Sequence, residues 1–576
     1  MSFAARSSRR RGGIVPRPRS PRSQLSLLLS LLLSALYLVG ASPARSQTQG
    51  FWHVFLYGNK VRDVVAQGDA VYAATSGGIV RLDPDGSFRQ WNRAPQGLVS
   101  DSVSCATADF GGSLWFGTEK AGISVLDPSS DRIRTITQLQ ESLPGDAIRR
   151  IRFYGSADAE TMLVAGGSGY SVFINGALRQ PSCYQGIELC DIPSYDVRDV
   201  IKVGDSLWLA TGNGIAVEYP TRLESGAVVR HWRSHSDGLP SGEMDFLARS
   251  DSLYAARDSS IWTWRGTAWG AAMEGLPAHF APACLYVHDS RIWTAGSRGV
   301  YVRQGGSWHA VGSPSFPATS LTMTSSGRLV AGAATSSPQF DLGSPPDGIW
   351  VLNGSTWMQH RVDGPSLRSF DWDAHFDADG KLWLGIYTPG ARPLVSRFSD
   401  GRWTLFNGGE GGHLNSTTWR IVEIPGHSGE YWLANGGCYT EDKMYLCHLE
   451  RLRFPGGQPE FTRYAPRNPY DLDADATGRL WISSYNSQAG LSYGVYWYSA
   501  GSSTPDSLTQ GMAGSRLLSD AVTAIRVAGR YVWIGYESHG VSRWDLGPDM
   551  IPDPNTDHWT DFSAAYSKPS LLFLRE

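Results

Sequence analysis

The sequence is poor in charge and has few long apolar runs. Charged side chains make up 18% of its 576 residues, whereas Gly (65), Tyr (24) and Trp (22) are abundant. This composition excludes a coiled coil or a disordered chain and is typical of an all-β protein rich in turns. Beyond the N-terminal region, no segment approaches the ~20 apolar residues of a membrane-spanning helix.

The sequence also lacks recognisable catalytic motifs. It contains no HExxH, no Walker loop and no GxSxG. The closest imitation is Gly167-Ser168-Gly169, where Tyr170 replaces the outer glycine and the context predicts a hairpin. We therefore predict no enzyme, no metal site and no cofactor. A carboxylate pair assembled in space from separate repeats stays open as an alternative, because sequence spacing does not reveal it.

The first 46 residues contain no Lys, Asp or Glu but hold eight Arg. An apolar run from Leu25 to Gly40 follows the basic stretch, and small residues allow cleavage after Ala44 or Ser46. This layout predicts a secretory signal peptide over residues 1–46 and an exported protein, whether periplasmic, cell-surface or extracellular. An uncleaved N-terminal anchor is the alternative, although the run is shorter than a spanning helix needs.

Without that segment the chain is acidic. It keeps 43 basic residues against 54 acidic ones, a net charge near −11. Nucleic acid is an unsuitable partner for such a surface, because phosphate binding needs a basic footprint. Docking on anionic lipid is disfavoured for the same reason.

The six cysteines fall into two groups. Cys183/Cys190 and Cys438/Cys447 are close pairs in loop-like stretches, which in an exported protein predicts two local disulfides, with free thiols as the alternative. Cys105 and Cys284 occupy the same place in two repeats and are expected to be small buried side chains.

A repeated unit organises nearly the whole chain. Its clearest copy is GLVSDSVSCATADFGGSLWFGTEKAGISVLD from Gly97, with alternating apolar residues separated by Gly and Asp turns. Variants of its second strand recur eleven times, from the one containing Tyr72 to the one containing Trp533. A period of about 40 to 50 residues with four strands per unit predicts a β-propeller.

Eleven repeats exceed one ring of the usual 4–8 blades. We expect a seven-bladed propeller over residues 47–353, in which an early outer strand from Phe51 completes the last blade. A second propeller of about four blades would occupy residues 354–576 and begin with the strand Thr356–Arg361. The tail from Ser567 resembles the start of another blade, so an incomplete gene product is one interpretation. A natural end, or a grouping of five plus six, is another.

The unit starting at Gly97 resembles the propeller repeat of two-component regulators, as do Phe376–Tyr387, Asp473–Tyr485 and Ser519–Val541. The opening segment Lys60–Asp83 also resembles the N-terminal propeller of PorZ-like type IX secretion proteins. The first resemblance implies a ligand-sensing ectodomain, and the second implies a cell-surface or secretion-accessory protein that binds other proteins. Neither family's downstream domains are recognisable in this sequence.

Two motifs invite functional interpretations that we consider weaker than structural ones. The Asp clusters around Asp377 and Asp475 imitate calcium loops, but Ile482 stands where the twelfth-position acid would be, and Asp and Gly favour tight turns. The Trp residues of LWFG, LWLA and LWLG could stack on sugars, yet a Trp on a second strand is expected to pack between adjacent blades.

Loop length distinguishes the later repeats. The loops between strands two and three are long in repeats seven to ten, and long loops on a rigid scaffold are common binding sites. The candidate ligand-binding residues on or beside them are Tyr387, Arg392, His413, Trp419, Tyr439, Tyr485 and Tyr493. The alternative is that these surface loops became long by neutral sequence change and bind nothing.

Together these features predict an exported, non-catalytic recognition module whose partner is an unknown oligosaccharide or protein. A ligand-sensing ectodomain is the first interpretation, a protein-binding surface or secretion accessory the second, and a propeller-type polysaccharide lyase or hydrolase the third.

Overall fold

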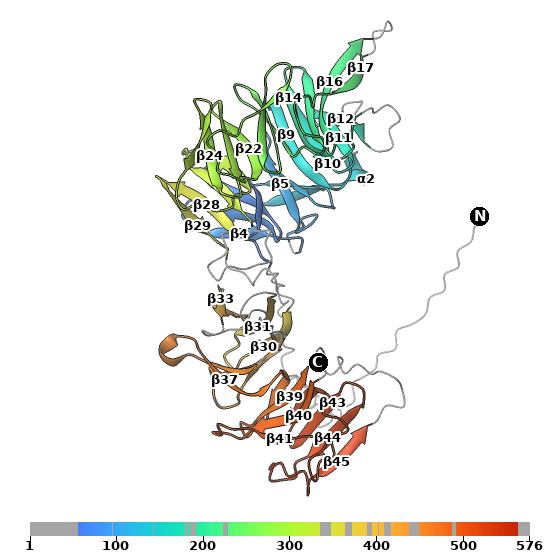
Figure 1. Cartoon of the computed structure of the whole chain (residues 1–576), viewed down its shortest axis with the longest axis vertical. Helices are drawn as coiled ribbons and strands as arrows, with labels where there is room; N and C mark the ends of the chain where they lie inside the picture. The colour runs from blue at the N-terminus through green and yellow to red at the C-terminus, as the bar shows by residue number, and fades with distance from the viewer. Residues whose placement is uncertain are drawn as a thin grey trace, which may run out of the picture. The chain divides into compact units, whose positions relative to one another are not determined.

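The structure is a computed structural model, and it describes residues 56–94, 96–141, 143–178, 183–184, 192–222, 228–334, 347–362, 371–388, 394–400, 402–407, 416–436, 448–486 and 491–562. These residues form eleven four-stranded antiparallel units (Figure 1). The chain is therefore an all-β propeller protein, as its repeats predict. Among the described residues, no helix is long and apolar enough to cross a membrane.

The first seven units follow one another along the chain, and each runs outward through four consecutive strands. They are β1 (Val61–Gln67), β2 (Ala70–Thr75), β3 (Gly78–Leu82), β4 (Phe88–Trp91); β5 (Val103–Ala108), β6 (Leu114–Thr118), β7 (Ile123–Asp127), β8 (Arg132–Ile136); β9 (Ile148–Ser156), β10 (Ala159–Gly166), β11 (Gly169–Ile174), β12 (Ala177–Leu178); β14 (Val197–Val203), β15 (Ser206–Thr211), β16 (Gly214–Arg222), β17 (Val228–Ser234); β18 (Phe246–Arg249), β19 (Leu253–Arg257), β20 (Ser260–Trp264), β21 (Trp269–Ala271); β22 (Pro282–His288), β23 (Arg291–Gly296), β24 (Gly299–Gln304), β25 (Ser307–Val311); and β26 (Ser320–Met323), β27 (Leu329–Ala333), β28 (Gly348–Asn353), β29 (Thr356–His360). A short strand β13 (Cys183–Tyr184) also pairs with β11, and a one-turn helix α2 (Gln138–Glu141) follows β8.

The last four units are built in the same way. They are β30 (Asp371–Phe376), β31 (Leu382–Thr388), β32 (Leu394–Ser399), β33 (Arg402–Asn407); β34 (Ser416–Glu423), β35 (Tyr431–Gly436), β36 (His448–Arg453), β37 (Glu460–Arg467); β38 (Pro469–Ala474), β39 (Leu480–Asn486), β40 (Leu491–Tyr498), β41 (Asp506–Leu508); and β42 (Val522–Ala528), β43 (Tyr531–Tyr536), β44 (Val541–Asp545), β45 (His558–Phe562). A 3-10 turn η1 (Pro455–Gly457) lies between β36 and β37. The end of β31 pairs with the start of β34, which joins the first two of these units into one sheet.

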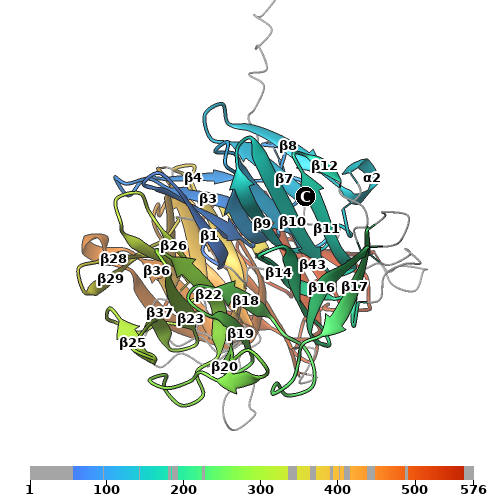
Figure 2. The same ribbon diagram turned by 90° about the horizontal axis from the view of Figure 1, so that it is seen from above.

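The innermost strands of the first seven units contact one another in a closed cycle. The order is β1, β5, β9, β14, β18, β22, β26 and back to β1, and Figure 2 shows most of these strands around a common centre. Val61 and Val64 of β1 share a buried cluster with Val330 of β27 and Ile349 of β28. The seven units therefore form a ring held together by apolar contacts between sheets.

The two ends of the ring are also fastened by a side-chain amide. Asn59 accepts a hydrogen bond from the Val362 N–H at 2.7 Å and donates one to the Val362 carbonyl at 2.9 Å. Tyr57 donates its hydroxyl proton to Asp347 nearby. The expected early outer strand from Phe51 lies mostly outside the described residues, and its end at Leu56 and Tyr57 belongs to no strand.

The expected start of the second propeller is wrong in one respect. Thr356–His360 pairs with β28 and is the outer strand of the seventh unit, so a boundary at residues 353/354 would divide a sheet. Beyond it, β30, β34, β38 and β42 contact one another in that order. Whether residues 354–576 form a propeller of their own stays a prediction.

The second strand of each unit supplies the core between neighbouring sheets. Trp481 is fully buried and packs with Val522 and Trp544 of the next unit. In the unit of Trp115, the Gly two residues after the Trp is needed for such a close approach, because a Cβ added to Gly117 would lie 2.6 Å from Ile148 of the next inner strand. The interpretation of the motif tryptophans as core residues is confirmed.

Candidate functional site

The innermost strands carry polar side chains toward the centre of the seven-unit ring. β1 and β14 share the sequence Val-Arg-Asp-Val, and in both strands a β-bulge shifts the register immediately before the Asp. A bulge turns the side chain that follows it away from the regular alternation. As a result Asp63 and Asp199, both largely buried, lie at the inner face of the ring.

Asp63 links three neighbouring strands. Its Oδ1 accepts the N–H of Val64 at 3.0 Å, and its Oδ2 accepts the N–H of Ala106 on β5 at 3.0 Å. Arg150 of β9 donates to the same Oδ2 at 3.2 Å. Burial raises the pKa of Asp63, and the charge of Arg150 and the two backbone N–H groups oppose that rise.

Asp199 repeats this arrangement with a stronger ion pair. Arg152 donates to Oδ1 from Nε at 2.9 Å and to Oδ2 from Nη2 at 2.7 Å, the bidentate geometry favoured by guanidinium and carboxylate. The N–H groups of Val200 and of Leu247 on β18 also donate to Asp199. Burial alone would lower the pKa of Arg152, but Asp199 raises it above its ordinary value.

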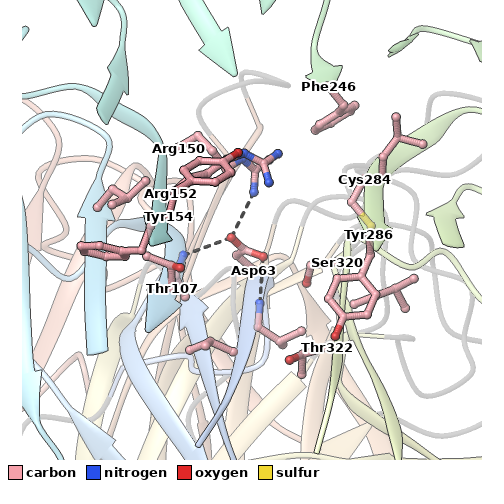
Figure 3. Close-up of a pocket in the computed structure, with 17 residues that line it drawn as sticks. Asp63, Thr107, Arg150, Arg152, Tyr154, Phe246, Cys284, Tyr286, Ser320 and Thr322 are labelled. Carbon is pink, nitrogen blue, oxygen red and sulfur yellow. Dashed lines mark hydrogen bonds and ion pairs between the residues drawn. The ribbon is translucent and has the colours of Figure 1, made fainter. Parts of the chain in front are cut away.

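These groups border a cavity of about 320 Å³ inside the ring (Figure 3). Its lining comes from β1, β5, β9, β18, β22 and β26, and includes Asp63, Arg150, Phe246, Tyr286, Ser320 and Thr322. The volume is at the lower end of the range for small-molecule sites. The lining combines aromatic surface with hydroxyl and charged groups, as such sites usually do.

Two polar atoms of this lining are buried without a hydrogen-bond partner. They are Nε of Arg150 and Oγ of Ser320, and Ser320 is only 2% exposed. Most buried polar groups in proteins find a partner, so such atoms call for an explanation, and a capacity to bind a water molecule or ligand is one. Their common position at the cavity makes this the candidate site.

The thiol and phenol groups of the cavity are neutral. Burial raises the pKa of the Cys284 thiol to about 12, and it raises the pKa values of Tyr154 and Tyr286. A reactive cysteine needs a lowered pKa. Cys105 lies buried beside the ring with a pKa raised to about 11. The expectation that both cysteines act as small buried side chains is confirmed.

The last four units carry a related row of inner charges. Arg420 of β34 pairs with Asp373 at 2.9 Å, and Arg526 of β42 pairs with Asp471 of β38 at 2.7 Å. As in the ring, each Asp also accepts a backbone N–H from the following inner strand, Ile421 for Asp373 and Ile525 for Asp471. These carboxylates therefore connect neighbouring sheets.

The Asp clusters that imitate calcium loops are turns. Asp377 accepts the N–H of Lys381 across the turn at 2.8 Å through Oδ1, while its Oδ2 accepts the indole N–H of Trp383 at 2.9 Å. Asp475 does the same for Arg479 and Trp481. The turn interpretation is confirmed for both. Among the described residues, no three His, Cys, Asp or Glu side chains are grouped to hold a metal ion.

The residues predicted for the long loops are only partly described. Arg392, His413 and Tyr439 lie outside the described residues, and so does the side chain of Tyr387, whose backbone is the next-to-last residue of β31. Tyr493 is half-buried on β40.

Trp419 and Tyr485 are brought together through a third ring. Tyr470 stacks on Trp419 with 5.4 Å between ring centroids and meets Tyr485 edge-on at 5.8 Å. Burial, and then the neighbouring Glu537, raises the pKa of Tyr485, which is 9% exposed. Sequence reasoning missed Tyr470. The sequence does contain a signal for Tyr470, because it occupies the same place in its repeat as Trp419. Both residues lie at the β-bulge near the start of an inner strand.

The disulfide prediction stays untested. Cys190, Cys438 and Cys447 lie outside the described residues, and of Cys183 only the backbone, paired with Tyr170, is described.

Sequence reasoning also missed the cavity residues Arg150, Arg152 and Ser320. The repeated Val-Arg-Asp-Val at Val61 and Val197 could have marked the inner aspartates, but their arginine partners lie in a different unit with the sequence Ile-Arg-Arg-Ile-Arg. Only the ring places them together.

Comparison with known proteins gives similar solved structures but no matching family. No family model matches the sequence, and no curated protein sequence is similar to it. Similar solved structures include PorZ, an essential bacterial surface component of the type IX secretion system of Porphyromonas gingivalis, with 16% identity, 89% of this chain and 82% of that chain covered, and a TM-score of 0.48. The extracellular domain of the putative one component system BT4673 from B. thetaiotaomicron is 14% identical, over 89% of this chain and 67% of that chain, with a TM-score of 0.38.

A GH74 enzyme from Niastella koreensis is also similar, at 14% identity over 88% of this chain and 86% of that chain, with a TM-score of 0.45. The similar structures include PorZ and the extracellular domain of a putative hybrid two component system from B. thetaiotaomicron, the two kinds of protein that the repeat motif resembles. Similarity at these identities bears on the fold alone.

Proposed function

We propose that this chain is an exported, non-catalytic recognition module that binds a small ligand in the central cavity of its seven-unit ring. The observation that carries the proposal is the cavity itself, in which Arg150 and Ser320 keep polar atoms buried and unpaired. A bound molecule would satisfy both atoms, and leaving them unsatisfied costs about 1–3 kcal/mol each.

The walls of the cavity are suited to binding because they are fixed before a ligand arrives. Arg152 is held by two hydrogen bonds to Asp199, and Asp63 by two backbone N–H groups and Arg150. A preorganised site loses little conformational entropy on association, so more of the contact energy contributes to affinity.

A ligand screen on the mature chain tests this function. Small metabolites and short oligosaccharides would be screened for a rise in Tm, and each hit would be measured by calorimetry. We expect a saturable 1:1 ligand whose affinity falls in the Ser320→Ala variant. If every hit binds the Ser320→Ala variant with the same affinity as the natural chain, the ligands bind elsewhere and the proposal is contradicted.

Export rests on the basic and apolar N-terminal segment. Expression in a bacterial host, fractionation and N-terminal sequencing would locate the protein and its first residue. Export predicts a chain beginning at Arg45 or at Gln47, the residues after the two cleavage sites. A full-length chain recovered from the cytoplasm would contradict it.

We also propose the aromatic group of the C-terminal units as a second contact surface, for an oligosaccharide or a protein partner. Its support is the stack of Trp419 on Tyr470, with Tyr485 beside it. The other predicted contact residues, close to these in sequence, are Tyr387, Arg392, His413, Tyr439 and Tyr493. Aromatic faces offer large contact areas at low entropic cost.

Replacing Tyr470 with Ala should weaken binding on a glycan array or to a captured partner at least tenfold, whereas Tyr219→Ala, an aromatic substitution on the outer part of the fourth unit, should not. Equal binding by both variants would remove this surface from consideration.

An enzymatic role is the remaining alternative. Glycoside hydrolysis uses two carboxyl groups about 5–10 Å apart on either side of the scissile bond. Among the described lining residues Asp63 is the one carboxylate, and both of its oxygens accept hydrogen bonds from the protein. Incubation with a panel of polysaccharides, followed by reducing-end detection, tests this alternative, and turnover lost in Asp63→Asn would establish it.

A further inference from the structure

The charges around the cavity cancel one another. Asp63 is paired with Arg150 and Asp199 with Arg152, so two carboxylates face two guanidinium groups. The remaining ionisable groups of the lining, Cys284, Tyr154 and Tyr286, stay uncharged at neutral pH because burial raises their pKa values. A charged ligand entering this site would lose its hydration without meeting an uncompensated opposite charge, which is costly.

The two unpaired polar atoms can form hydrogen bonds with hydroxyl groups. Nε of Arg150 is a donor and needs an oxygen acceptor, whereas Oγ of Ser320 can donate or accept. Arg150 lies on β9 and Ser320 on β26, on different sides of the ring. A ligand that satisfies both therefore needs at least two hydrogen-bonding atoms, one of them an acceptor, separated across its own width.

The rest of the lining adds apolar surface to a small cavity. Phe246 lies with its ring 5.8 Å from the Arg150 guanidinium, and the ring of Tyr286 faces the same space. Rings of this kind pack against C–H faces, and the volume of about 320 Å³ suits a single ring rather than an extended oligomer.

We infer that the cavity binds a small uncharged ligand with several hydroxyl groups, of the size of a single sugar ring. This inference rests on the proposed ligand-binding function and specifies its substrate class. The ion pairs supply a neutral polar wall, Arg150 and Ser320 supply directed hydrogen bonds, and Phe246 and Tyr286 supply apolar contact.

Matched ligands that differ only in charge test the inference. Glucose, glucuronate and glucosamine, and the corresponding galactose series, would be titrated calorimetrically into the mature chain at pH 7. We expect at least one neutral sugar to bind, with its acidic and amino counterparts at least tenfold weaker. A charged member that binds as tightly as its neutral counterpart overturns the inference.

The outcomes separate this inference from the function beneath it. If no neutral sugar or polyol binds while other small molecules bind in a Ser320-dependent manner, the ligand class is wrong and the binding function stands. If no small molecule binds in the cavity, both fail.

A pair of Ser→Ala variants distinguishes binding from stability. The hydroxyl of Ser320 has no partner in the protein, so Ser320→Ala should leave Tm unchanged or slightly higher while weakening the neutral sugar about 3- to 10-fold. Ser104, on the inner strand β5, donates to the Ile148 carbonyl at 2.6 Å and does not line the cavity. Ser104→Ala should therefore lower Tm and leave affinity unchanged, and the reverse pattern would contradict the site.

Discussion

At the scale of single residues, Asp377 stabilises both its own turn and two buried aromatic side chains. Asp377 caps its turn through Oδ1, and its Oδ2 accepts hydrogen bonds from Trp383 and from the hydroxyl of Tyr431 on the next unit at 2.7 Å. Both aromatic side chains are almost fully buried, so their donors have no alternative partner in water. The motif spacing from Asp to Trp is explained by this shared carboxylate.

Asp377→Ala should therefore lower the free energy of unfolding by about 2–4 kcal/mol, because it leaves two buried donors unpaired. Asp379→Ala is the matched control in the same turn, where an exposed pair with Lys381 is lost and about 0–1 kcal/mol is expected. Urea denaturation followed by Trp fluorescence measures both. Similar losses in the two variants would show that the turn, and not the buried bonds, sets the cost.

The pH dependence of stability is also set by particular residues. Burial, followed by the charge of Arg420, lowers the pKa of His375, although Asp373, Glu423 and Asp377 oppose this effect. Its Nε2 is buried without a partner, so a second ring proton would have no acceptor. Folded His375 thus binds a proton less readily than the same residue in the unfolded chain below about pH 6.5, where an unperturbed His titrates.

We expect the free energy of unfolding to fall as the pH drops from 7 toward 5, and His375→Phe to remove part of that slope. Burial lowers the pKa values of His235 and His360 as well, so some slope should persist. His309→Gln, on the exposed face of β25, serves as the control. Denaturant titrations at several pH values check this, and a slope unchanged by His375→Phe would contradict it.

At the scale of elements, the inner strands are joined by carboxylates instead of backbone ladders. Asp199 connects β14 to β9 through Arg152 and to β18 through the Leu247 N–H. Asp199→Asn should cost about 3–5 kcal/mol, because Arg152 would keep a partly buried charge without its partner. Asp205→Asn, in the exposed turn of the same unit, should change stability by less than 0.5 kcal/mol. Thermal unfolding of the two variants measures the difference.

The strands themselves could be predicted from the sequence because their evidence is local. Alternating apolar residues, Gly and Asp turns and the LWxG spacing lie within a single unit. The partner of an outer strand is not local information. Thr356–His360 resembles the outer strands that precede other units, and only its pairing with β28 shows that it closes the seventh.

The cavity could not be predicted for the same reason. Asp63, Arg150 and Ser320 are separated by 87 residues or more along the chain and meet because the ring closes. Of the predicted aromatic residues, Trp419 and Tyr485 do lie together, but Tyr470 joins them from another inner strand. Sequence patterns indicate which residues face inward, whereas ring closure decides which of them share a site.

At the scale of the whole molecule, contacts between neighbouring units are described both in the ring and among the four C-terminal units. Asn59 fastens the ring to Val362, and Asp471 joins the tenth unit to the eleventh. In repeat architectures, each unit is stabilised mainly by its neighbours. We therefore predict two unfolding transitions in calorimetry, one for the ring up to about residue 362 and one for the units beyond it.

Two variants assign these transitions. Asn59→Ala should lower the Tm of one transition alone, by a few degrees, since it removes two buried hydrogen bonds worth about 1–3 kcal/mol. Asp471→Asn should lower only the other, because Arg526 and the Ile525 N–H lose their charged acceptor. Ligand binding in the ring cavity should raise the Tm of the transition that Asn59→Ala lowers and leave the Tm of the other unchanged. A ligand stabilises only the part of the chain whose folding creates its site. A single transition shifted by both substitutions would mean that the chain unfolds as one cooperative unit, and that a division near residue 362 has no thermodynamic basis.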